Sequence, residues 1–402
     1  MRIALATVGT TGDVRPFAAL AAALAARGHD LTAISWELHA PAFAETGARF
    51  EAAGPSTTAP DIAATAARAA AEKRPTAQVA VLRDFHLRDA VEHERRLREL
   101  LAGHDLAVIH GIHSLAQAAA DDAGIRWATA VFDPVLLPTR TAPPAGMPNL
   151  GPLNPLAWGL LDRMLRPLDA PLHAALAAAG SPSRPSLFRG RSPRLHLVAC
   201  SPSIVAVPSD LPATTHISGY WPPPAGAPLD GELVAFLDAG EPPVVVSFGS
   251  MAGTATAPLL TAVTVAARAL GRRVVVQDGA ASRPRADGDV ISIGEADHRL
   301  LLPRAAAVVH HGGAGTAHAV AAAGVPSVVV PHVGDQRYWA QRLRQLGVAA
   351  KPIPLANATP ELVQSRLAAA LSAPTRAAAR ALGERVRVED GIGTAVRLIE
   401  QM

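Results

Sequence analysis

The sequence predicts an α/β protein of two domains, each built on a parallel β-sheet. Short apolar runs alternate with Gly-rich turns and Ala/Leu-rich helical stretches, first in residues 1–35 and again in residues 306–331. This alternation is typical of βαβ units. The length of 402 residues gives each half enough chain to bury its own core. A Pro/Gly cluster in residues 219–230 separates the halves, because proline removes the donors that a sheet interior needs.

The first half is expected to form an N-terminal domain over residues 1–215, followed by a linker over 216–232. Its apolar runs predict buried strands, and its Ala-rich stretches predict helices. Strands are expected at 1–8, 31–35, 106–110, 127–132 and 194–200, helices at 14–27 and 114–123, and a partly helical, proline-broken region at 149–179.

The second half is expected to form a C-terminal domain over residues 233–384. A last helix, at about 385–402, is expected to pack back on the N-terminal domain. Strands are expected at 243–248, 273–277, 306–310 and 327–331, and helices at 257–270, 317–323 and 359–372.

Composition excludes several classes of protein. Hydrophobic residues make up 49% and charged residues 18%, as in a globular chain. The net charge of +3 comes without a Lys/Arg block, so a nucleic-acid partner is not expected. Cys200 is the single cysteine, and no apolar run approaches the roughly 18 residues of a membrane span. A cytoplasmic enzyme without integral membrane association is expected, and the sequence leaves its oligomeric state open.

The strongest functional signal is the segment from His311 to Thr316, where three glycines fall within four positions between a strand and a helix. A helix N-terminus offers free N–H groups and a positive dipole end, which together bind phosphate. His311 is expected to donate to a phosphate oxygen and offset its charge, and Thr316 adds a hydroxyl. The alternative is a tight structural turn with an N-cap threonine. The candidate phosphate-binding positions are His311, Gly313, Ala314, Gly315 and Thr316.

Asp335 and Gln336 lie in a loop after the next strand. A carboxylate that only accepts hydrogen bonds, next to an amide that donates and accepts, suits adjacent sugar hydroxyls. The alternative is a helix N-cap before residues 337–346.

These segments together resemble the donor-binding region of family 1 glycosyltransferases, above all the bacterial antibiotic and macrolide enzymes and the sterol glucosyltransferases. The resemblance spans roughly forty residues and several fixed spacings. It implies the GT-B fold, two facing Rossmann-like domains with a cleft between them, in which the second domain holds the nucleotide sugar. It further implies that the turn from His311 to Thr316 contacts the pyrophosphate and that Asp335 and Gln336 contact the sugar. The residues that carry it are 310–316, 323–326, Pro331, Asp335, Gln336, Ala340, Arg342 and 346–348.

Two upstream segments extend this resemblance. Residues 247–250, ending at Ser250, resemble the family's Gly/Ser turn near the phosphates, and the alternative is an ordinary strand-to-helix turn. Residues 295–303 resemble the segment that cradles the base, with Ala296 offering backbone groups and His298 at a place usually held by Gln or His. No aromatic residue lies in that segment, so the choice between a uridine and a thymidine donor stays open.

Asp13 is the candidate catalytic base. It stands in a Gly-rich loop after the first strand, where open α/β sheets bind ligands. Sugar transfer from a nucleotide needs a base to deprotonate the attacking hydroxyl. Residues 12–16 resemble the family's Gly-(His or Asp)-x-x-Pro element, which opens the first helix. The alternative for Asp13 is a helix cap. Thr11 is a candidate donor contact or a turn residue.

An acceptor pocket in the first half is expected to be largely apolar. Trp36, Phe85, His113 and Phe132 are its candidate lining residues, against the alternative that they belong to the core or surface. His110 or His113 is a further candidate for the base, or for a residue that assists Asp13.

No metal or cofactor is expected besides the nucleoside-diphosphate sugar as co-substrate. Asp287-Gly288-Asp289 predicts a turn before a strand, and no His/Cys cluster has metal-ligand spacing. The expected activity moves a sugar from a dTDP or UDP donor to a hydroxyl of a small, largely apolar natural product. The resemblance implies inversion at the anomeric carbon. The alternatives are a nucleotide-sugar epimerase and a non-catalytic auxiliary protein with the same fold.

Overall fold

The computed structural model divides the chain into two compact units. Unit 1 comprises residues 1–202, 206–224 and 390–402, and unit 2 comprises residues 203–205 and 225–389. The structure describes residues 1–72, 74–144, 147–187, 189–249, 257–277, 281, 283–332 and 334–402. Among these, no helix has both the length and the apolar character needed to cross a membrane.

Unit 1 is built on a seven-stranded sheet in the order β3-β2-β1-β4-β5-β6-β7, and every neighbouring pair is parallel. The predicted strands are confirmed, while β3 and β7 are additional. Both are short strands at the two edges of the sheet, with too few apolar residues to stand out in the sequence. The strands are β1 (Arg2–Ala6), β2 (Asp30–Ser35), β3 (Arg49–Ala52), β4 (Leu106–His110), β5 (Arg126–Val131), β6 (Leu195–Val198) and β7 (Thr215–Ile217).

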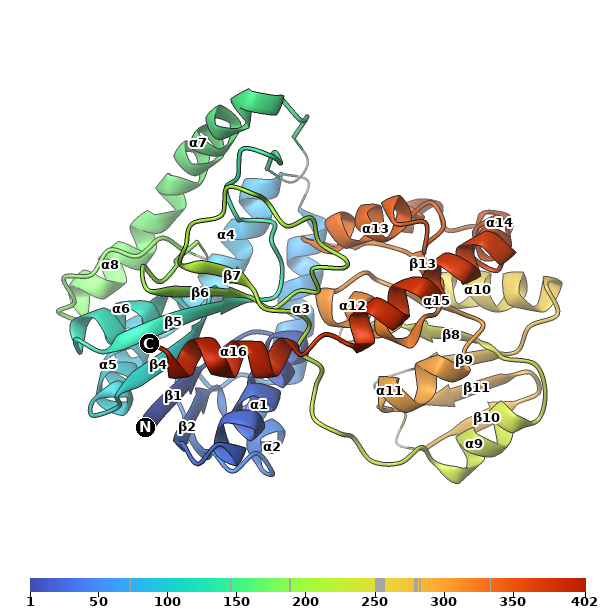
Figure 1. The fold of residues 1–402 in the computed structure, drawn as a ribbon, viewed down its shortest axis with the longest axis horizontal. Helices are drawn as coiled ribbons and strands as arrows, with labels where there is room; N and C mark the ends of the chain where they lie inside the picture. Colours follow the sequence, from blue (N-terminus) through green and yellow to red (C-terminus); the bar gives the residue numbers. More distant parts are fainter. Residues whose placement is uncertain are drawn as a thin grey trace. The chain divides into compact units, whose positions relative to one another are not determined.

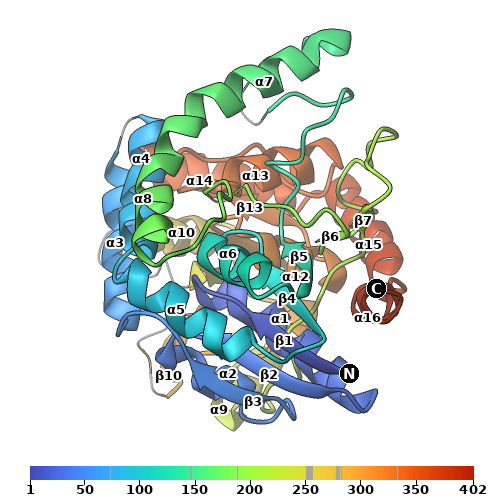
Figure 2. The same cartoon turned by 90° about the vertical axis from the view of Figure 1, so that its left-hand side faces the viewer.

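Helices cover both faces of this sheet (Figures 1 and 2). Alternate residues of a strand point to opposite faces, so Ile3 and Leu5 pack with α1, α2 and α16, while Ala4 and Ala6 pack with α5, α6 and α8. Short 3-10 segments and α7 complete the proline-broken region. The helices are α1 (Thr11–Ala26), α2 (Ala40–Phe43), α3 (Ala59–Ala71), α4 (Pro75–His86), α5 (Ala90–Leu101), α6 (Ser114–Asp122), α7 (Asn154–Leu165), α8 (Ala170–Ala178) and α16 (Gly391–Glu400).

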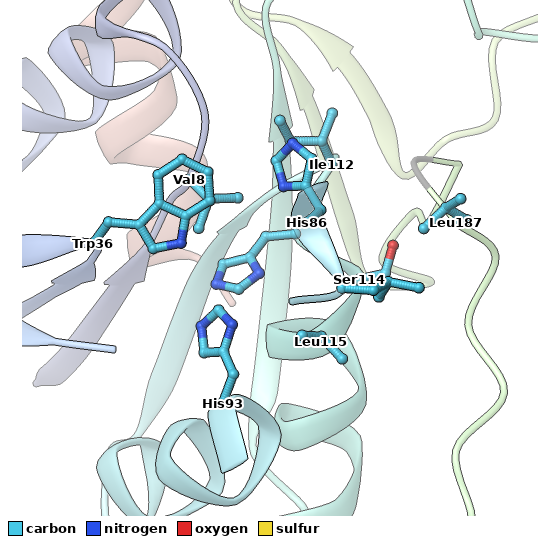
Figure 3. Close-up of a pocket in the computed structure, with 10 residues that line it drawn as sticks. Val8, Trp36, His86, His93, Ile112, Ser114, Leu115 and Leu187 are labelled. Atoms are coloured by element: carbon cyan, nitrogen blue, oxygen red, sulfur yellow. The ribbon is translucent and has the colours of Figure 1, made fainter. Parts of the chain in front are cut away.

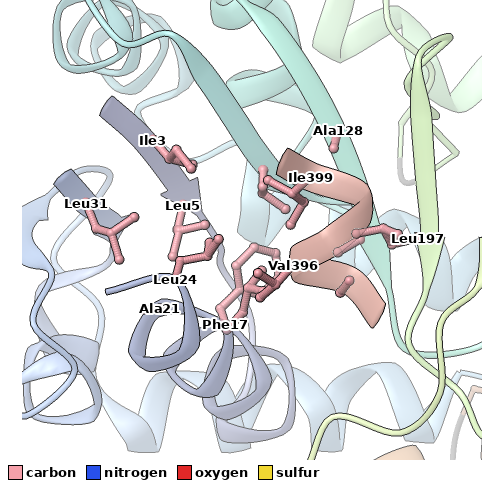
Figure 4. Close-up of a cluster of buried hydrophobic side chains, with 14 of the residues drawn as sticks. Ile3, Leu5, Phe17, Ala21, Leu24, Leu31, Ala128, Leu197, Val396 and Ile399 are labelled. Carbon is pink, nitrogen blue, oxygen red and sulfur yellow. The ribbon is translucent and has the colours of Figure 1, made fainter. Parts of the chain in front are cut away.

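The last helix, α16, belongs to unit 1. Val396 and Ile399 pack into the same core as Phe17 of α1 and Leu197 of β6, as Figure 4 shows. Arg27 and His29 also bind Glu400 near the end of α16. The helix begins at Gly391 and not near residue 385, because the preceding helix continues to Arg387 and the Asp390 side chain accepts from the Gly393 N–H as the cap of α16.

Unit 2 is built on a six-stranded sheet in the order β10-β11-β9-β8-β12-β13. All neighbouring pairs are parallel except β10 and β11, which form an antiparallel hairpin through the expected turn at Gly288. The strands are β8 (Val244–Ser247), β9 (Val274–Gln277), β10 (Arg285–Asp287), β11 (Val290–Ile293), β12 (Ala307–His310) and β13 (Ser327–Val329).

Helices also cover both faces of this second sheet. One face packs with α10 and α14, and the other packs with α9, α11 and α12. The helix expected at 317–323 begins at Ala314, so the Gly-rich segment supplies its first turn. The helices are α9 (Gly231–Asp238), α10 (Ala257–Ala269), α11 (His298–Leu301), α12 (Ala314–Ala323), α13 (Gln336–Gln345), α14 (Pro360–Ala370) and α15 (Ala373–Arg387).

Each sheet has one point where the strand order reverses. In unit 1 the chain builds outward from β1 to β3, then returns to the other side of β1 at β4. In unit 2 the corresponding pair is β8 and β12. Open α/β sheets bind ligands outside the carboxyl ends of the strands at such a switch point. The segments that follow these four strands are therefore the places to examine for a site.

Candidate active site

The segment after β1 holds Asp13 in a fixed position. Asp13 is the third residue of α1, and its Oδ2 accepts from the backbone N–H of Thr10 at 2.7 Å and from the Thr10 hydroxyl at 2.9 Å. Asp13 thus caps the N-terminus of its own helix through the Thr10 backbone N–H, as the third residue of a capping box does. Gly9 has φ of +119°, and a Cβ there would lie 2.5 Å from Asp13 Oδ2. Glycine at position 9 therefore leaves the space that the carboxylate occupies.

The other oxygen of Asp13 faces a buried histidine from β4. Asp13 Oδ1 lies 3.9 Å from Nε2 of His110, beyond hydrogen-bond length. His110 Nδ1 lies 3.3 Å from the carbonyl oxygen of Val8. Burial lowers the pKa of His110, although Asp13 and the Val8 carbonyl act in the opposite direction. The cap thus occupies one carboxylate oxygen of Asp13 and leaves the second beside an imidazole, so capping and catalysis do not compete for the same atom.

The charge of Asp13 acts on two more titratable side chains that the sequence did not single out. His39 has a pKa lowered by burial, which the Gly9 backbone and the Asp13 charge partly oppose. Asp133, just after β5, has a pKa raised by burial, with a further contribution from the Asp13 charge. Neither residue lies in a motif, because each comes from a segment remote in sequence from Asp13. The carboxyl end of the unit 1 sheet thus carries two carboxylates and two imidazoles.

Beside this site lies a small hollow that we call the imidazole pocket. Its lining includes Trp36, His86, His93, Ile112, His113 and Leu187. Figure 3 shows the rings of Trp36, His86 and His93 turned toward the same space. Two predicted acceptor residues, Trp36 and His113, thus come together here.

The two other predicted acceptor residues are placed differently. Phe85 contacts the edge of the Trp36 ring, with centroids 5.6 Å apart. Phe132 lies away from this group, against His110 at 5.1 Å and against Phe17 and Trp221 at 6.0 Å each. Of the two histidines predicted as a base or its assistant, His110 is the neighbour of Asp13. His113 instead pairs with His93, with ring centroids 5.3 Å apart.

The turn after β12 in unit 2 is shaped by steric demands on its glycines. Gly312 has φ of +90°, and a Cβ there would lie 2.7 Å from Val329 Cγ1. A Cβ on Gly313 would lie 2.5 Å from His311 Nε2. Nothing lies within 4 Å of a Cβ on Gly315. The first two glycines are needed by the turn itself, while the third opens onto space next to the first turn of α12. Thr316 and Ala314 stand half-buried in that turn, and Gly313 is the N-cap in place of the threonine considered above.

His311 is neutral at pH 7 in this structure. Burial, helped by the nearby His332, lowers its pKa to about 4, while the Ser247 backbone opposes the shift. A neutral His311 brings no positive charge to the turn in the ligand-free protein, so its compensation of phosphate charge stays a prediction for the complex. A neutral imidazole still donates one hydrogen bond. His311 Nδ1 is buried without a hydrogen-bond partner among the described residues.

A set of hydrogen bonds to one acceptor, the side-chain oxygen of Gln277, joins β8, β9 and α11. The Ser247 hydroxyl donates to Gln277 Oε1 at 2.7 Å, and His298 Nε2 lies 2.9 Å from the same oxygen. His298 thus stands at the carboxyl end of the sheet, and Ala296 packs half-buried against the core just before it. Ser250, also predicted here, lies outside the described residues. Gln277 has no motif of its own, and only the sheet register reveals its place beside Ser247.

Asp335 is held by its own helix and Gln336 by the segment just before that helix. Asp335 stands at the N-cap of α13, but its side chain makes no capping bond, and its Oδ2 accepts from the Trp339 indole at 2.8 Å. Gln336 Oε1 accepts from the His332 N–H at 2.7 Å. These bonds fix the two side chains side by side at the start of α13. Thr11, the remaining predicted donor contact, is the exposed first residue of α1 in unit 1.

Known proteins resemble this chain in sequence and in fold. Residues 278–390 match the family described as erythromycin biosynthesis protein CIII-like, C-terminal domain. The chain is 34% identical to O-mycaminosyltylonolide 6-deoxyallosyltransferase of Streptomyces fradiae, over 100% of this chain and 97% of the relative. It is 33% identical to vancomycin aglycone glucosyltransferase of Amycolatopsis orientalis, over 99% and 97%. The solved glycosyltransferase VinC in complex with dTDP aligns with a TM-score of 0.70 at 22% identity, over 100% of both chains.

Two Rossmann-like units with the strand order of doubly wound sheets define the chain as a GT-B protein. The chain belongs to the family 1 glycosyltransferases and is a glycosyltransferase of the group that acts in antibiotic biosynthesis. The resemblance inferred from the residues is confirmed.

Proposed function

We propose that this glycosyltransferase moves a sugar from a thymidine or uridine diphosphate sugar to a hydroxyl of a natural product. The support on the acceptor side comes from relatives whose names state O-mycaminosyltylonolide and the vancomycin aglycone as the compounds they act on. The support on the donor side comes from the uncapped α12 turn and from the dTDP complex of a structural neighbour. The single observation that carries the proposal is the placement of Asp13 and of the His311 turn, each at the switch point of its own sheet.

The donor diphosphate is assigned to the turn from His311 to Thr316. The N–H groups of the first turn of α12 point out of its N-terminus, and the helix dipole favours an anion there. His311 donates a hydrogen bond as a neutral imidazole, and Gly315 leaves room for a phosphate oxygen to approach the backbone. Asp335 and Gln336 are assigned to the sugar hydroxyls, since Trp339 and the His332 backbone hold both side chains in place.

Asp13 is assigned as the general base. The acceptor oxygen attacks the anomeric carbon while the bond from that carbon to the diphosphate oxygen breaks. The hydroxyl proton passes to Asp13 Oδ1, and the nucleoside diphosphate leaves as a stable anion. Thr10 fixes the orientation of the carboxylate through Oδ2. His110 keeps its lone proton toward the Val8 carbonyl and faces Asp13 as a neutral ring, so it does not neutralise the base by an ion pair.

We further propose direct displacement with inversion and without a metal ion. The Asp-x-Asp sequence supports the second part, because Asp289 is bound by Arg268 at 2.6–2.9 Å within the β10–β11 hairpin. Arg268 holds the pKa of Asp289 below its usual value. A carboxylate held in this way serves the hairpin and not a metal-bound diphosphate.

The proposal is tested with the full chain, a panel of UDP- and dTDP-sugars and a panel of hydroxylated natural products, with products identified by mass. The expected result is a product heavier by one sugar residue and unchanged activity after EDTA. Thermal-shift measurements with TDP and with UDP show which of the two nucleotides binds more tightly. Failure of every nucleotide diphosphate to bind would refute the donor assignment, whereas binding without transfer or sugar hydrolysis would favour a non-catalytic role.

A further inference from the structure

The imidazole pocket contains buried polar atoms that lack partners. Trp36 Nε1, both ring nitrogens of His93 and Nε2 of His113 are buried without hydrogen-bond partners among the described residues. A buried polar group that stays unpaired destabilises the fold, because it has given up its hydrogen bonds to water. Native proteins leave few polar groups unpaired, and four of them around one space require an explanation. The space is small, close to the size of a single oxygen atom.

The unpaired rings are held together by the backbone and by other rings. Gly54 has φ of +105°, and a Cβ there would lie 2.8 Å from Trp36 Cδ1 and 2.9 Å from His93 Cε1. Trp36 also stacks on His39, with centroids 5.9 Å apart. The close approach of Gly54 fixes Trp36 and His93 at a spacing that a larger residue would change. The pocket is therefore built into the fold and does not depend on a loose side chain.

The chemistry of the three rings selects the occupant. Burial lowers the pKa of His93 to about 4 and that of His113 well below its usual value, so both rings are neutral at pH 7. A neutral imidazole carries one donor and one acceptor, and the indole of Trp36 is a donor only. A cation would leave the indole N–H unpaired, and a carboxylate would leave the imidazole lone pairs unpaired. A hydroxyl both donates and accepts, so it pairs with the indole N–H and with an imidazole lone pair at the same time.

The pocket adjoins the segment that carries Asp13. Val8 lines the pocket, its carbonyl faces His110, and Gly9 and the Asp13 loop follow directly. His39, which stacks on Trp36, has a pKa influenced by Asp13. One ligand on unit 1 can therefore reach the base with one group and the pocket with another.

We propose that the imidazole pocket binds a second hydroxyl of the acceptor, distinct from the hydroxyl that receives the sugar. This inference rests on the proposed function, since it assigns the acceptor to unit 1. It defines the acceptor class as compounds with an apolar body and at least two hydroxyls. It also assigns His93, together with Trp36 and His113, a role in acceptor specificity.

The test compares pairs of probes that share one apolar body, namely dihydroxynaphthalene against naphthol and para,para-dihydroxybiphenyl against para-hydroxybiphenyl. Binding to the full chain is measured by calorimetry, and the imidazole nitrogens are followed by NMR. The diol of at least one pair is expected to bind about 5- to 100-fold tighter than its monohydroxy partner. This is the gain expected when a buried polar group acquires a hydrogen-bond partner. The His93 and His113 ring signals are expected to shift with the diol.

His93→Phe and His113→Phe are expected to abolish the diol preference, while His93→Gln, which keeps a donor and an acceptor, retains part of it. A water-filled structural void predicts the opposite, a more stable His93→Phe protein with unchanged probe affinities, and this result would overturn the inference. Absence of a diol preference in the wild type would overturn it as well. TDP binding by the same proteins is measured in parallel. Normal TDP binding with no diol preference refutes only this inference, whereas loss of TDP binding in the wild type refutes the proposed function.

Discussion

The two Gly-rich turns of this molecule, one before α1 and one before α12, occupy equivalent places in their sheets. They differ in whether a side chain caps the N-terminus of the helix that follows. Each follows a buried parallel strand at a switch point, and each leads into a helix, α1 in unit 1 and α12 in unit 2. In unit 1 Thr10 and Asp13 form a capping box, so a carboxylate of the chain itself lies at the helix mouth. In unit 2 the N-cap is Gly313, which has no side chain to offer.

This difference predicts which chemistry each turn performs. A helix N-terminus that already carries a carboxylate of the chain repels a phosphate. The same hydrogen bonds hold that carboxylate in place to act as a base. A helix N-terminus without a side-chain cap keeps its first N–H groups free, and these groups and the helix dipole can bind an external anion. We therefore expect the turn of unit 1 to serve proton transfer and the turn of unit 2 to bind the diphosphate.

The largest expected effect comes from Asp13→Asn. Asparagine keeps the shape of the side chain and can still accept from Thr10, but it cannot take the hydroxyl proton. We expect kcat to fall about 10²- to 10⁴-fold, the usual contribution of a general base. Steady-state transfer kinetics with a saturating donor measure this loss.

The control for Asp13→Asn is the unfolding temperature and the affinity for TDP, which should both match the wild type. A variant with normal transfer rate would exclude Asp13 as the base and would leave its cap as its main role.

The next effect concerns Gly315 in the uncapped turn. Apart from the chain neighbours and the backbone of α12 itself, no described atom lies within 4 Å of a Cβ at this position, so Gly315→Ala should fold normally and gain slightly in helix propensity. If a phosphate approaches the backbone there, the added methyl group blocks it. We expect the Kd for TDP to rise about tenfold or more, a change of about 1.4 kcal/mol. Calorimetric titration with TDP measures the change.

Gly231→Ala is the matched control, because Gly231 is also in the first turn of a helix and also has nothing within 4 Å of an added Cβ. It should leave TDP affinity unchanged. Wild-type TDP affinity in Gly315→Ala would contradict the placement of the diphosphate at α12 and would make the turn purely structural.

Much of the fold could be predicted from the sequence because buried parallel strands are continuous apolar runs. Residues 106–110 and 307–310 are such runs, and both form strands. The edge strands β3, β7 and β10 escaped prediction, since segments such as Arg49–Ala52 carry charge and lie half-exposed. The helix α12 was expected to begin at residue 317 but begins at Ala314. The three glycines of the segment have low intrinsic helix propensity, and they hid the true start.

The site was predictable only where its residues share a local segment. Asp13 and His311 belong to turns whose chemistry is visible in a few adjacent letters. His93, Gly54 and Trp36 lie in α5 and in the loops after β3 and β2, and only the folded sheet brings them to one pocket. The same holds for Gln277, which reaches Ser247 through strand register. Side chains that come together only in the folded structure are far apart in the sequence, so no motif with a fixed spacing reveals them.

The smallest expected effect separates the two functions of the capping box. Thr10→Val removes the hydroxyl that donates to Asp13 Oδ2 and keeps the backbone N–H that donates to the same oxygen. Loss of one capping interaction costs about 1 kcal/mol, which corresponds to a fall of about 2–4 °C in unfolding temperature. We expect kcat to fall only a few-fold, because the carboxylate keeps its position, and TDP affinity to stay unchanged, because the change lies in unit 1. A loss of kcat as large as that of Asp13→Asn would mean that the Thr10 hydroxyl itself takes part in proton transfer, and the division of labour between the two carboxylate oxygens would then be wrong.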